Sequence, residues 1–140
     1  CIETSGYAPA ESYQQVARQM DLVIQDIKLL DPAAHRYYTG VDNAMILHNV
    51  CWLVHSGIPF RIRVPLIPTV NDNPAMMEGI VHLLEGAHAL EKVELLPYNT
   101  AAGAKYAGLS MDYQPQFPVS HKPNIPIEPF KEAGIPCDIL

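Results

Sequence analysis

Short apolar runs alternate along the chain with amphipathic stretches, and this pattern predicts strands and helices in alternation. Residues 22–27 form a nearly continuous apolar run, which is typical of a strand covered on both faces. Similar reasoning predicts a strand end at residues 1–3 and further strands at residues 60–67, 93–96 and 136–140. The amphipathic stretches between these runs predict helices, and another helix is expected at residues 126–133.

Polar residues and a glycine mark the ends of several predicted helices. Asp31 before Pro32, the pair Asp42 and Asn43, and Asn73 before Pro74 are typical helix starts, and Gly57 is a typical helix stop. The apolar spacing places one side of each helix toward the core. The residues expected on these faces are Tyr13, Val16, Ala17 and Met20; Leu47, Val50, Cys51 and Val54; and Met77, Ile80, Val81 and Leu84.

Repeated strand–helix–strand units predict an α/β fold with parallel strands joined by right-handed crossovers. Four or five such strands in 140 residues form either a small open sheet or part of a barrel. In both architectures ligands collect at the carboxyl ends of the strands. Residues 1–140 are expected to form a single domain, of which the Pro-rich last 30 residues look like an appendage.

Composition and charge exclude several classes of protein. The chain is 49% hydrophobic and 17% charged, which indicates a globular protein rather than a disordered one. A net charge of −6 argues against a nucleic-acid partner. No segment resembles a signal peptide or a membrane span, so a cytoplasmic protein without membrane contact is expected.

Cysteine and histidine spacing does not predict a metal centre. Cys1, Cys51 and Cys137 are widely separated, which argues against a disulfide framework and against a complete zinc or iron–sulfur site within this chain. The six histidines are poorly phased for one ion, and we expect them on solvated or half-buried faces.

The expected carboxyl ends of the strands carry most of the candidate chemistry. Asp26 and Lys28 are two apart on one strand and therefore point the same way, as do Arg61 and Arg63 on the next. Such a rim suits a zwitterionic small molecule, since carboxylates bind ammonium and hydroxyl groups while Lys and Arg bind carboxylates. The polar residues near these ends are Glu3, Thr4, Asp26, Lys28, Arg61, Arg63, Glu94, Tyr98 and Asn99. Among them Glu3, Thr4 and Asp26 could also hold a hard cation through oxygen ligands.

Four stretches at these ends resemble one protein family. IETSGYAP, DLVIQDIKLLDPAAHRYYTGVDN, RIRVPLIPTVND and VELLPYNTAAGAKY, in this order and spacing, resemble the radical S-adenosylmethionine (SAM) enzymes that activate glycyl-radical enzymes. Pyruvate formate-lyase activating enzyme is the best-known type. The resemblance covers residues 1–106, and residues 107–140 resemble the family's variable C-terminal tail.

The resemblance implies a fold, and it implies that the residues that bind the cluster lie outside this chain. The family has an incomplete, TIM-like barrel of βα units, whose early strands carry a CxxxCxxC loop for a [4Fe–4S] cluster and a Gly-Gly-Glu turn. Neither motif occurs here, and the chain begins at what looks like the third strand. It therefore resembles the C-terminal half of an activating enzyme, with the cluster ligands outside this chain.

The resemblance also implies cofactor-binding residues, and no catalytic acid or base. Glu3 and Thr4 match residues that bind SAM and a nearby monovalent cation, although the best-known members have Asp in place of Glu3. The pair Asp26 and Lys28 matches the Asp-x-Lys motif that contacts the ribose and the methionine carboxylate. The further matches are Arg63, a strand arginine that faces the cofactor, and Asn99, which replaces the histidine of formate-lyase activators. Asn carries no charge and cannot titrate as histidine does. The change therefore indicates a family member that activates a different glycyl-radical enzyme.

The implied reaction is reductive cleavage of SAM to a 5′-deoxyadenosyl radical, which abstracts hydrogen from a glycine of the partner glycyl-radical enzyme. The electron donor would be a flavodoxin or a ferredoxin. The 140 residues alone are expected to be inactive and to bind SAM weakly, because the cluster loop is absent.

Two other functions fit parts of the pattern. A Schiff-base aldolase could use Lys28 as its nucleophile, since a strand-end lysine beside Asp26 suits that chemistry. Alternatively, the chain could be a non-catalytic α/β module that binds a nucleotide or a protein partner.

Overall fold

A computed structural model describes residues 1–99, 106, 108–112 and 114–140. Its elements follow the order β1 (Ile2–Thr4), α1 (Ala10–Ala17), β2 (Val23–Asp26), α2 (Pro32–Thr39), α3 (Ala44–Ser56), β3 (Phe60–Leu66), α4 (Pro74–Leu83), β4 (Leu90–Pro97), α6 (Glu128–Glu132) and β5 (Cys137–Ile139). The last residues of the fourth quoted stretch, 100–105, lie outside the described ones.

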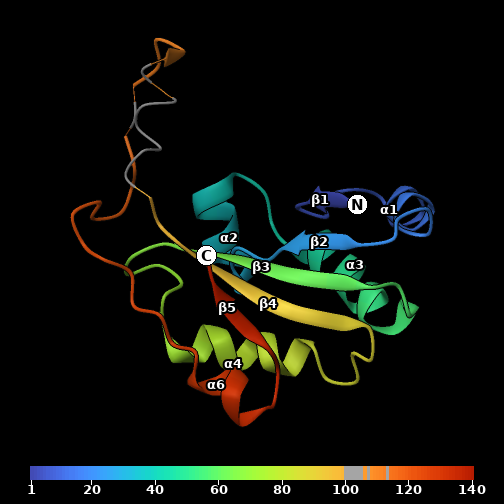
Figure 1. The fold of residues 1–140 in the computed structure, drawn as a ribbon. Coiled ribbons are helices and arrows are strands. Elements are labelled where there is room, and N and C mark those ends of the chain that lie inside the picture. The colour runs from blue at the N-terminus through green and yellow to red at the C-terminus, as the bar shows by residue number, and fades with distance from the viewer. Residues whose placement is uncertain (100–105, 107, 113) are drawn as a thin grey trace.

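The five strands pair in sequence order, β1-β2-β3-β4-β5, and every pair is parallel. Figure 1 shows a curved sheet that does not close on itself, with β1 and β5 at its two edges. The expectation of parallel βα units in part of a barrel is therefore confirmed. Among the described residues, no helix has the length and apolar character needed to cross a membrane.

The predicted helix ends are confirmed in detail. Asp31 Oδ1 accepts a hydrogen bond from the backbone N–H of Ala34 at 2.6 Å, and Asn73 Oδ1 accepts one from Met76 at 3.0 Å. Gly57 ends α3 with a φ of 74°, the left-handed conformation in which glycine avoids the strain of a side chain.

Two of the predicted helix faces are partly wrong. Val16 is 42% exposed, and Cys51, expected on the inner face of α3, is exposed. The buried face of α3 instead includes Asn49, whose Nδ2 donates to the carbonyl oxygens of Gly6 and Ala8, both at 2.9 Å. A polar residue bonded to the β1–α1 loop thus lies where hydrophobic spacing expects an apolar one.

The end of the chain is built into the fold rather than appended to it. Phe130 in α6 is fully buried, and α6 lies against α4 (Figure 1). Strand β5 pairs with β4, where Cys137 aligns with Val93. The appendage expected for the last 30 residues is therefore wrong for residues 128–139, because this segment fills the core and extends the sheet.

Strand β1 is an exposed edge, and we expect it to favour self-association of the 140-residue chain. It has three residues and pairs only with β2 within the described part of the chain. The outward backbone groups can pair with a second chain. Light scattering over a range of concentrations should show mass above that of a monomer, also in a variant with Cys1→Ser and Cys51→Ser, which excludes linkage through the exposed thiols. A strict monomer at high concentration would contradict the expectation.

Candidate functional site

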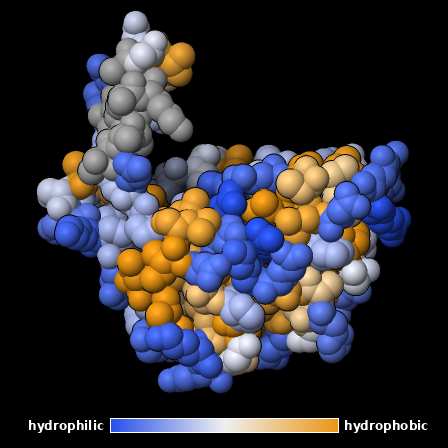
Figure 2. All heavy atoms as spheres, in the orientation of Figure 1, coloured by the Kyte–Doolittle hydropathy of each residue, from blue (hydrophilic) through white to orange (hydrophobic). Residues whose placement is uncertain are grey.

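The carboxyl halves of the strands bring charged side chains into one row. In the sheet register Asp26 lies beside Arg63, Arg63 beside Glu94, and Glu94 beside Asp138. Burial alternates along β3, so Arg61 and Arg63 point away from the fully buried residues of the same strand. Figure 2 shows hydrophilic side chains gathered over this face of the sheet.

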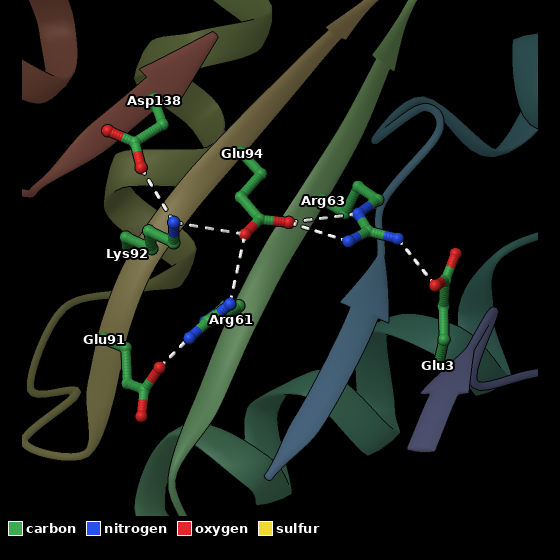
Figure 3. A network of polar contacts seen from close by, with 7 residues as sticks. All are labelled: Glu3, Arg61, Arg63, Glu91, Lys92, Glu94 and Asp138. Atoms are coloured by element: carbon green, nitrogen blue, oxygen red, sulfur yellow. Dashed lines mark hydrogen bonds and ion pairs between the residues drawn. The ribbon is translucent and has the colours of Figure 1, made fainter. Parts of the chain in front are cut away.

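Glu94 lies at the centre of this face, and its side chain is only 3% exposed. Its Oε2 accepts hydrogen bonds from Arg63 Nε at 3.1 Å and Arg63 Nη2 at 2.9 Å. Its Oε1 lies 3.4 Å from Arg61 Nη1 and 3.4 Å from Lys92 Nζ (Figure 3). Burial alone would raise the pKa of Glu94, but the hydrogen bonds from Arg63 and Lys92 outweigh burial and hold this pKa below its usual value.

The cations around Glu94 each have a second carboxylate. Arg61 Nε donates to Glu91 Oε2 at 2.7 Å, and Lys92 Nζ to Asp138 Oδ2 at 2.7 Å. Arg63 Nη1 lies 2.6 Å from Glu3 Oε2. We call the set Glu3, Arg61, Arg63, Glu91, Lys92, Glu94 and Asp138 the ionic network (Figure 3). It links β1, β3, β4 and β5 across one face of the sheet.

The lowered pKa of Glu94 predicts acid-dependent stability. The unfolded chain takes up the Glu94 proton at a higher pH than the folded chain does. The stabilisation is therefore present above the unfolded pKa, about 4.3, and is lost as pH falls through the lower folded value. Urea unfolding between about pH 6 and about pH 3 should show a steeper fall in unfolding free energy for the wild type than for Glu94→Gln. Equal slopes would contradict this assignment.

Asp26 and Lys28 form the predicted pair at the end of β2. Lys28 Nζ donates to Asp26 Oδ2 at 3.0 Å, and the Lys28 side chain remains 40% exposed. Asp26 Oδ1 is buried and has no hydrogen-bond partner among the described residues. A buried acceptor left unpaired costs about 1–3 kcal/mol, so this oxygen suits a ligand that brings a donor.

The other predicted site residues are less closely grouped. Glu3 contacts Arg63 rather than Thr4 or Asp26, and Thr4 Oγ1 accepts a hydrogen bond from the Gly6 N–H at 3.0 Å. Asn99 is exposed and follows the end of β4 by two residues. The cation ligand set of Glu3, Thr4 and Asp26 thus stays a prediction. The described residues contain no group of three or more His, Cys, Asp or Glu that could hold a metal ion.

A pocket of about 310 Å³ adjoins the Asp26–Lys28 pair, and His35 lines it. His35 was expected on a solvated or half-buried face, but it is 3% exposed. Its Nδ1 lies 2.7 Å from the carbonyl oxygen of Val41, which can only accept, so Nδ1 carries the proton. Its hydrogen bond to Val41 stabilises the turn after α2. The expectation was wrong because this contact requires the side chain to be buried.

Lys92 and Glu91 were not among the residues expected at the strand ends, and Glu94 was expected there without a cofactor-binding role. A signal for two of them was present, since Lys92 and Glu94 are two apart on a strand and must share a face. What spacing does not show is which side of β4 faces the helices. The pairing with Arg61 and Arg63 depends on the register between β3 and β4.

No family model matches the chain, but individual proteins do. It is 37% identical over 115 residues to the choline trimethylamine-lyase activating enzyme of Oleidesulfovibrio alaskensis, a match that covers 80% of this chain and 37% of that protein. It is 30% identical over 113 residues to the pyruvate formate-lyase-activating enzyme of Clostridium pasteurianum, covering 81% of this chain and 47% of that protein. Relatives that match about 80% of this chain at 30–37% identity are thus glycyl-radical-enzyme activating enzymes.

This similarity confirms the resemblance found in the sequence, and the fold agrees with it. A domain of pyruvate-formate lyase-activating enzyme from Bacteroides vulgatus superimposes with a TM-score of 0.74 at 24% identity, covering 99% of this chain and 78% of that chain. The chain spans less than half the length of the curated relatives named above.

Proposed function

We propose that these residues are the SAM-holding, C-terminal part of an enzyme that generates a glycyl radical on a partner protein. The observation that supports this most directly is the Asp26–Lys28 pair at one strand end. It offers a half-exposed ammonium and a buried acceptor that has no partner among the described residues. A hydroxyl donor and a carboxylate on one ligand would satisfy both. SAM carries both groups, on its ribose and on its methionine end.

The other residues fit around that ligand. Asp26 Oδ1 would accept from the ribose, and Lys28 would bind the carboxylate. Arg63 and Asn99 would line the remaining rim, and Glu3 and Thr4 would help to bind SAM and a nearby monovalent cation. All of these residues bind and orient, and none is placed to transfer a proton.

The remaining parts of the enzyme would come from outside these residues. A [4Fe–4S] cluster needs a CxxxCxxC loop, whereas Cys1, Cys51 and Cys137 are all free and far apart in sequence. With the cluster reduced by a flavodoxin or ferredoxin, bound SAM supplies the radical chemistry that removes a hydrogen atom from the partner's glycine. In this proposal residues 1–140 form one domain of the partial barrel, and residues 107–140 correspond to the variable C-terminal tail of the family, of which residues 128–139 are built into the core and the sheet.

The coding sequence upstream of Cys1 gives the test of this function. A continuous frame that encodes CxxxCxxC and Gly-Gly-Glu would allow the complete protein to be produced without oxygen and mixed with SAM, a reductant and a glycyl-radical enzyme encoded nearby. We expect the electron paramagnetic resonance signal of a glycyl radical on the partner. Absence of that signal with a loaded cluster would contradict the proposal. Reduction by borohydride that traps a carbonyl compound on Lys28 would support the aldolase alternative instead.

The 140-residue chain by itself should bind SAM weakly. Only one side of the ligand would be contacted, because the cluster that chelates it is held by other residues. Calorimetric titration should give a dissociation constant above about 10 μM, which corresponds to about −7 kcal/mol. Tighter binding would show that these residues suffice for the site.

A further inference from the structure

Two buried asparagines hold the main chain between β2 and α2, the segment that carries Lys28. Asn71 Nδ2 donates a hydrogen bond to the carbonyl oxygen of Lys28 at 2.7 Å. Asn43 Nδ2 donates to the next two carbonyl oxygens, those of Leu29 at 2.9 Å and Leu30 at 2.7 Å. Three consecutive carbonyl groups are therefore bound by asparagine residues that are at most 2% exposed.

Asn71 joins the ends of two neighbouring strands. The register between β2 and β3 ends two residues before Lys28. Beyond that point Asn71 Nδ2 donates both to Lys28 and to the carbonyl oxygen of Pro65, the latter at 2.8 Å. Its Oδ1 accepts a hydrogen bond from the Ile67 N–H at 2.7 Å. Because both N–H groups and the oxygen of this amide have partners, the orientation of the Asn71 side chain is determined.

The turn that carries Asn71 has a strained backbone. Thr69 has a φ of 65°, in the left-handed region that a β-branched residue rarely adopts. Such a conformation persists only where the surrounding contacts determine it. In this turn the Val70 N–H donates to the carbonyl oxygen of Ile67 at 3.1 Å, and Asn71 supplies the contacts to β3 and to the end of β2. The hydrogen bonds of Asn71 are thus among the contacts that offset the strain at Thr69.

The direction of the Lys28 side chain depends on its main chain. A lysine carries its charge at the end of a flexible four-carbon stem, and that of Lys28 is 40% exposed. Its ion pair with Asp26 at 3.0 Å joins it to the end of its own strand and does not fix it relative to β3. The hydrogen bond from Asn71 does, because Asn71 is also bonded to the end of β3.

We propose that Asn71 is a positioning residue for SAM, which holds the carbonyl oxygen of Lys28 and so fixes the point from which the Lys28 ammonium reaches the ligand carboxylate. The inference rests on the proposed function, because it concerns the role given there to Lys28. Both N–H groups of the Asn71 side chain already have partners, and the residue is 2% exposed. It therefore acts through Lys28 and does not bind the ligand itself.

Equilibrium binding of SAM to the complete enzyme tests this role in two backgrounds. Asn71→Ala should weaken binding about tenfold when Lys28 is present, because the ammonium is no longer held in place. In the Lys28→Met background it should change binding by less than about twofold, because no ammonium is left to position. An equal loss in both backgrounds would show that Asn71 supports only the fold and would overturn the inference, as would wild-type affinity in Asn71→Ala.

Asn73→Ala is the matched control. Asn73 lies in the same connection between β3 and α4, and its Oδ1 accepts a hydrogen bond from the Met76 N–H at the start of α4. Losing this cap destabilises the connection without removing a contact to Lys28. The SAM affinity of Asn73→Ala should equal that of the wild type. A loss as large as that in Asn71→Ala would mean that any weakening of this connection lowers affinity, and the inference would be wrong.

A double variant covers the case in which Asn71→Ala fails to fold. Thr69→Gly allows the turn to keep its left-handed conformation without the strain of a side chain. It should therefore raise the unfolding temperature of Asn71→Ala. The double variant should still bind SAM about tenfold more weakly than Thr69→Gly alone. An affinity that recovers together with stability would overturn the role of Asn71.

A second readout uses the 140-residue chain and requires no SAM. The Leu29 N–H lies in the same peptide plane as the Lys28 carbonyl group. Its ¹⁵N order parameter should be about 0.85 in the wild type, as in rigid backbone, and should fall in Asn71→Ala but not in Asn73→Ala. An unchanged value in Asn71→Ala would overturn the inference. A complete wild-type enzyme that binds no SAM would contradict the proposed function instead, and the order parameter would still decide whether Asn71 holds this segment.

Discussion

Replacing Phe130 by alanine is expected to lower the free energy of unfolding of the chain by about 3–5 kcal/mol. Phe130 is fully buried although it comes from the five-residue helix α6. A helix this short does not form by itself, so the buried ring contributes much of the attachment of α6 to the core. Removing the ring leaves a cavity that the rigid sheet cannot fill.

Urea unfolding monitored by circular dichroism measures this loss. Leu109→Ala is the matched control, because Leu109 also follows β4 but is 72% exposed, and it should change stability by less than about 0.5 kcal/mol. If the two variants are equally stable, then the end of the chain does not contribute to the core. Strand β5 carries Asp138 of the ionic network, so destabilising this end of the chain by Phe130→Ala should also weaken the ion pair between Lys92 and Asp138.

The strand positions and the helix ends could be predicted because they depend on local signals. Asp31 and Asn73 cap helices through their own side chains, and the apolar run before Lys28 needs no tertiary information to be identified as a buried strand. The burial of Asn49 and His35 could not be predicted in this way. Each bonds to backbone oxygens of a loop, and loop positions follow only from the assembled fold.

In the candidate site, too, contacts between residues close in sequence could be predicted, and contacts that depend on the assembled fold could not. The adjacency of Asp26 and Lys28 follows from their spacing on one strand, and the structure shows the pair at 3.0 Å. The contact between Glu3 and Arg63 could not be predicted, since it spans from β1 to β3 across an intervening strand. Two residues predicted as separate ligand contacts are therefore partners of each other in this structure.

In the complete enzyme, Lys28→Met is expected to weaken SAM binding by about 10- to 100-fold, the equivalent of a hydrogen bond to a charged group worth about 1.5–3 kcal/mol. Methionine keeps the length and the apolar stem of the side chain but removes the ammonium group that would face the ligand carboxylate. The same change leaves both oxygens of Asp26 without a partner, since Lys28 is the residue bonded to Oδ2 and Oδ1 has none among the described residues.

Equilibrium binding and thermal unfolding should be measured on the same samples. Lys131→Met is the control, because Lys131 is a 63% exposed lysine whose pairing with Glu128 at 3.7 Å lies on α6, away from the strand ends. It should bind SAM as the wild type does. A parallel loss of affinity in both variants would mean that net charge, rather than the position of Lys28, determines binding. Loss of affinity only in Lys28→Met, in a variant that stays folded at the temperature of the binding measurement, would place the ligand carboxylate at the end of β2.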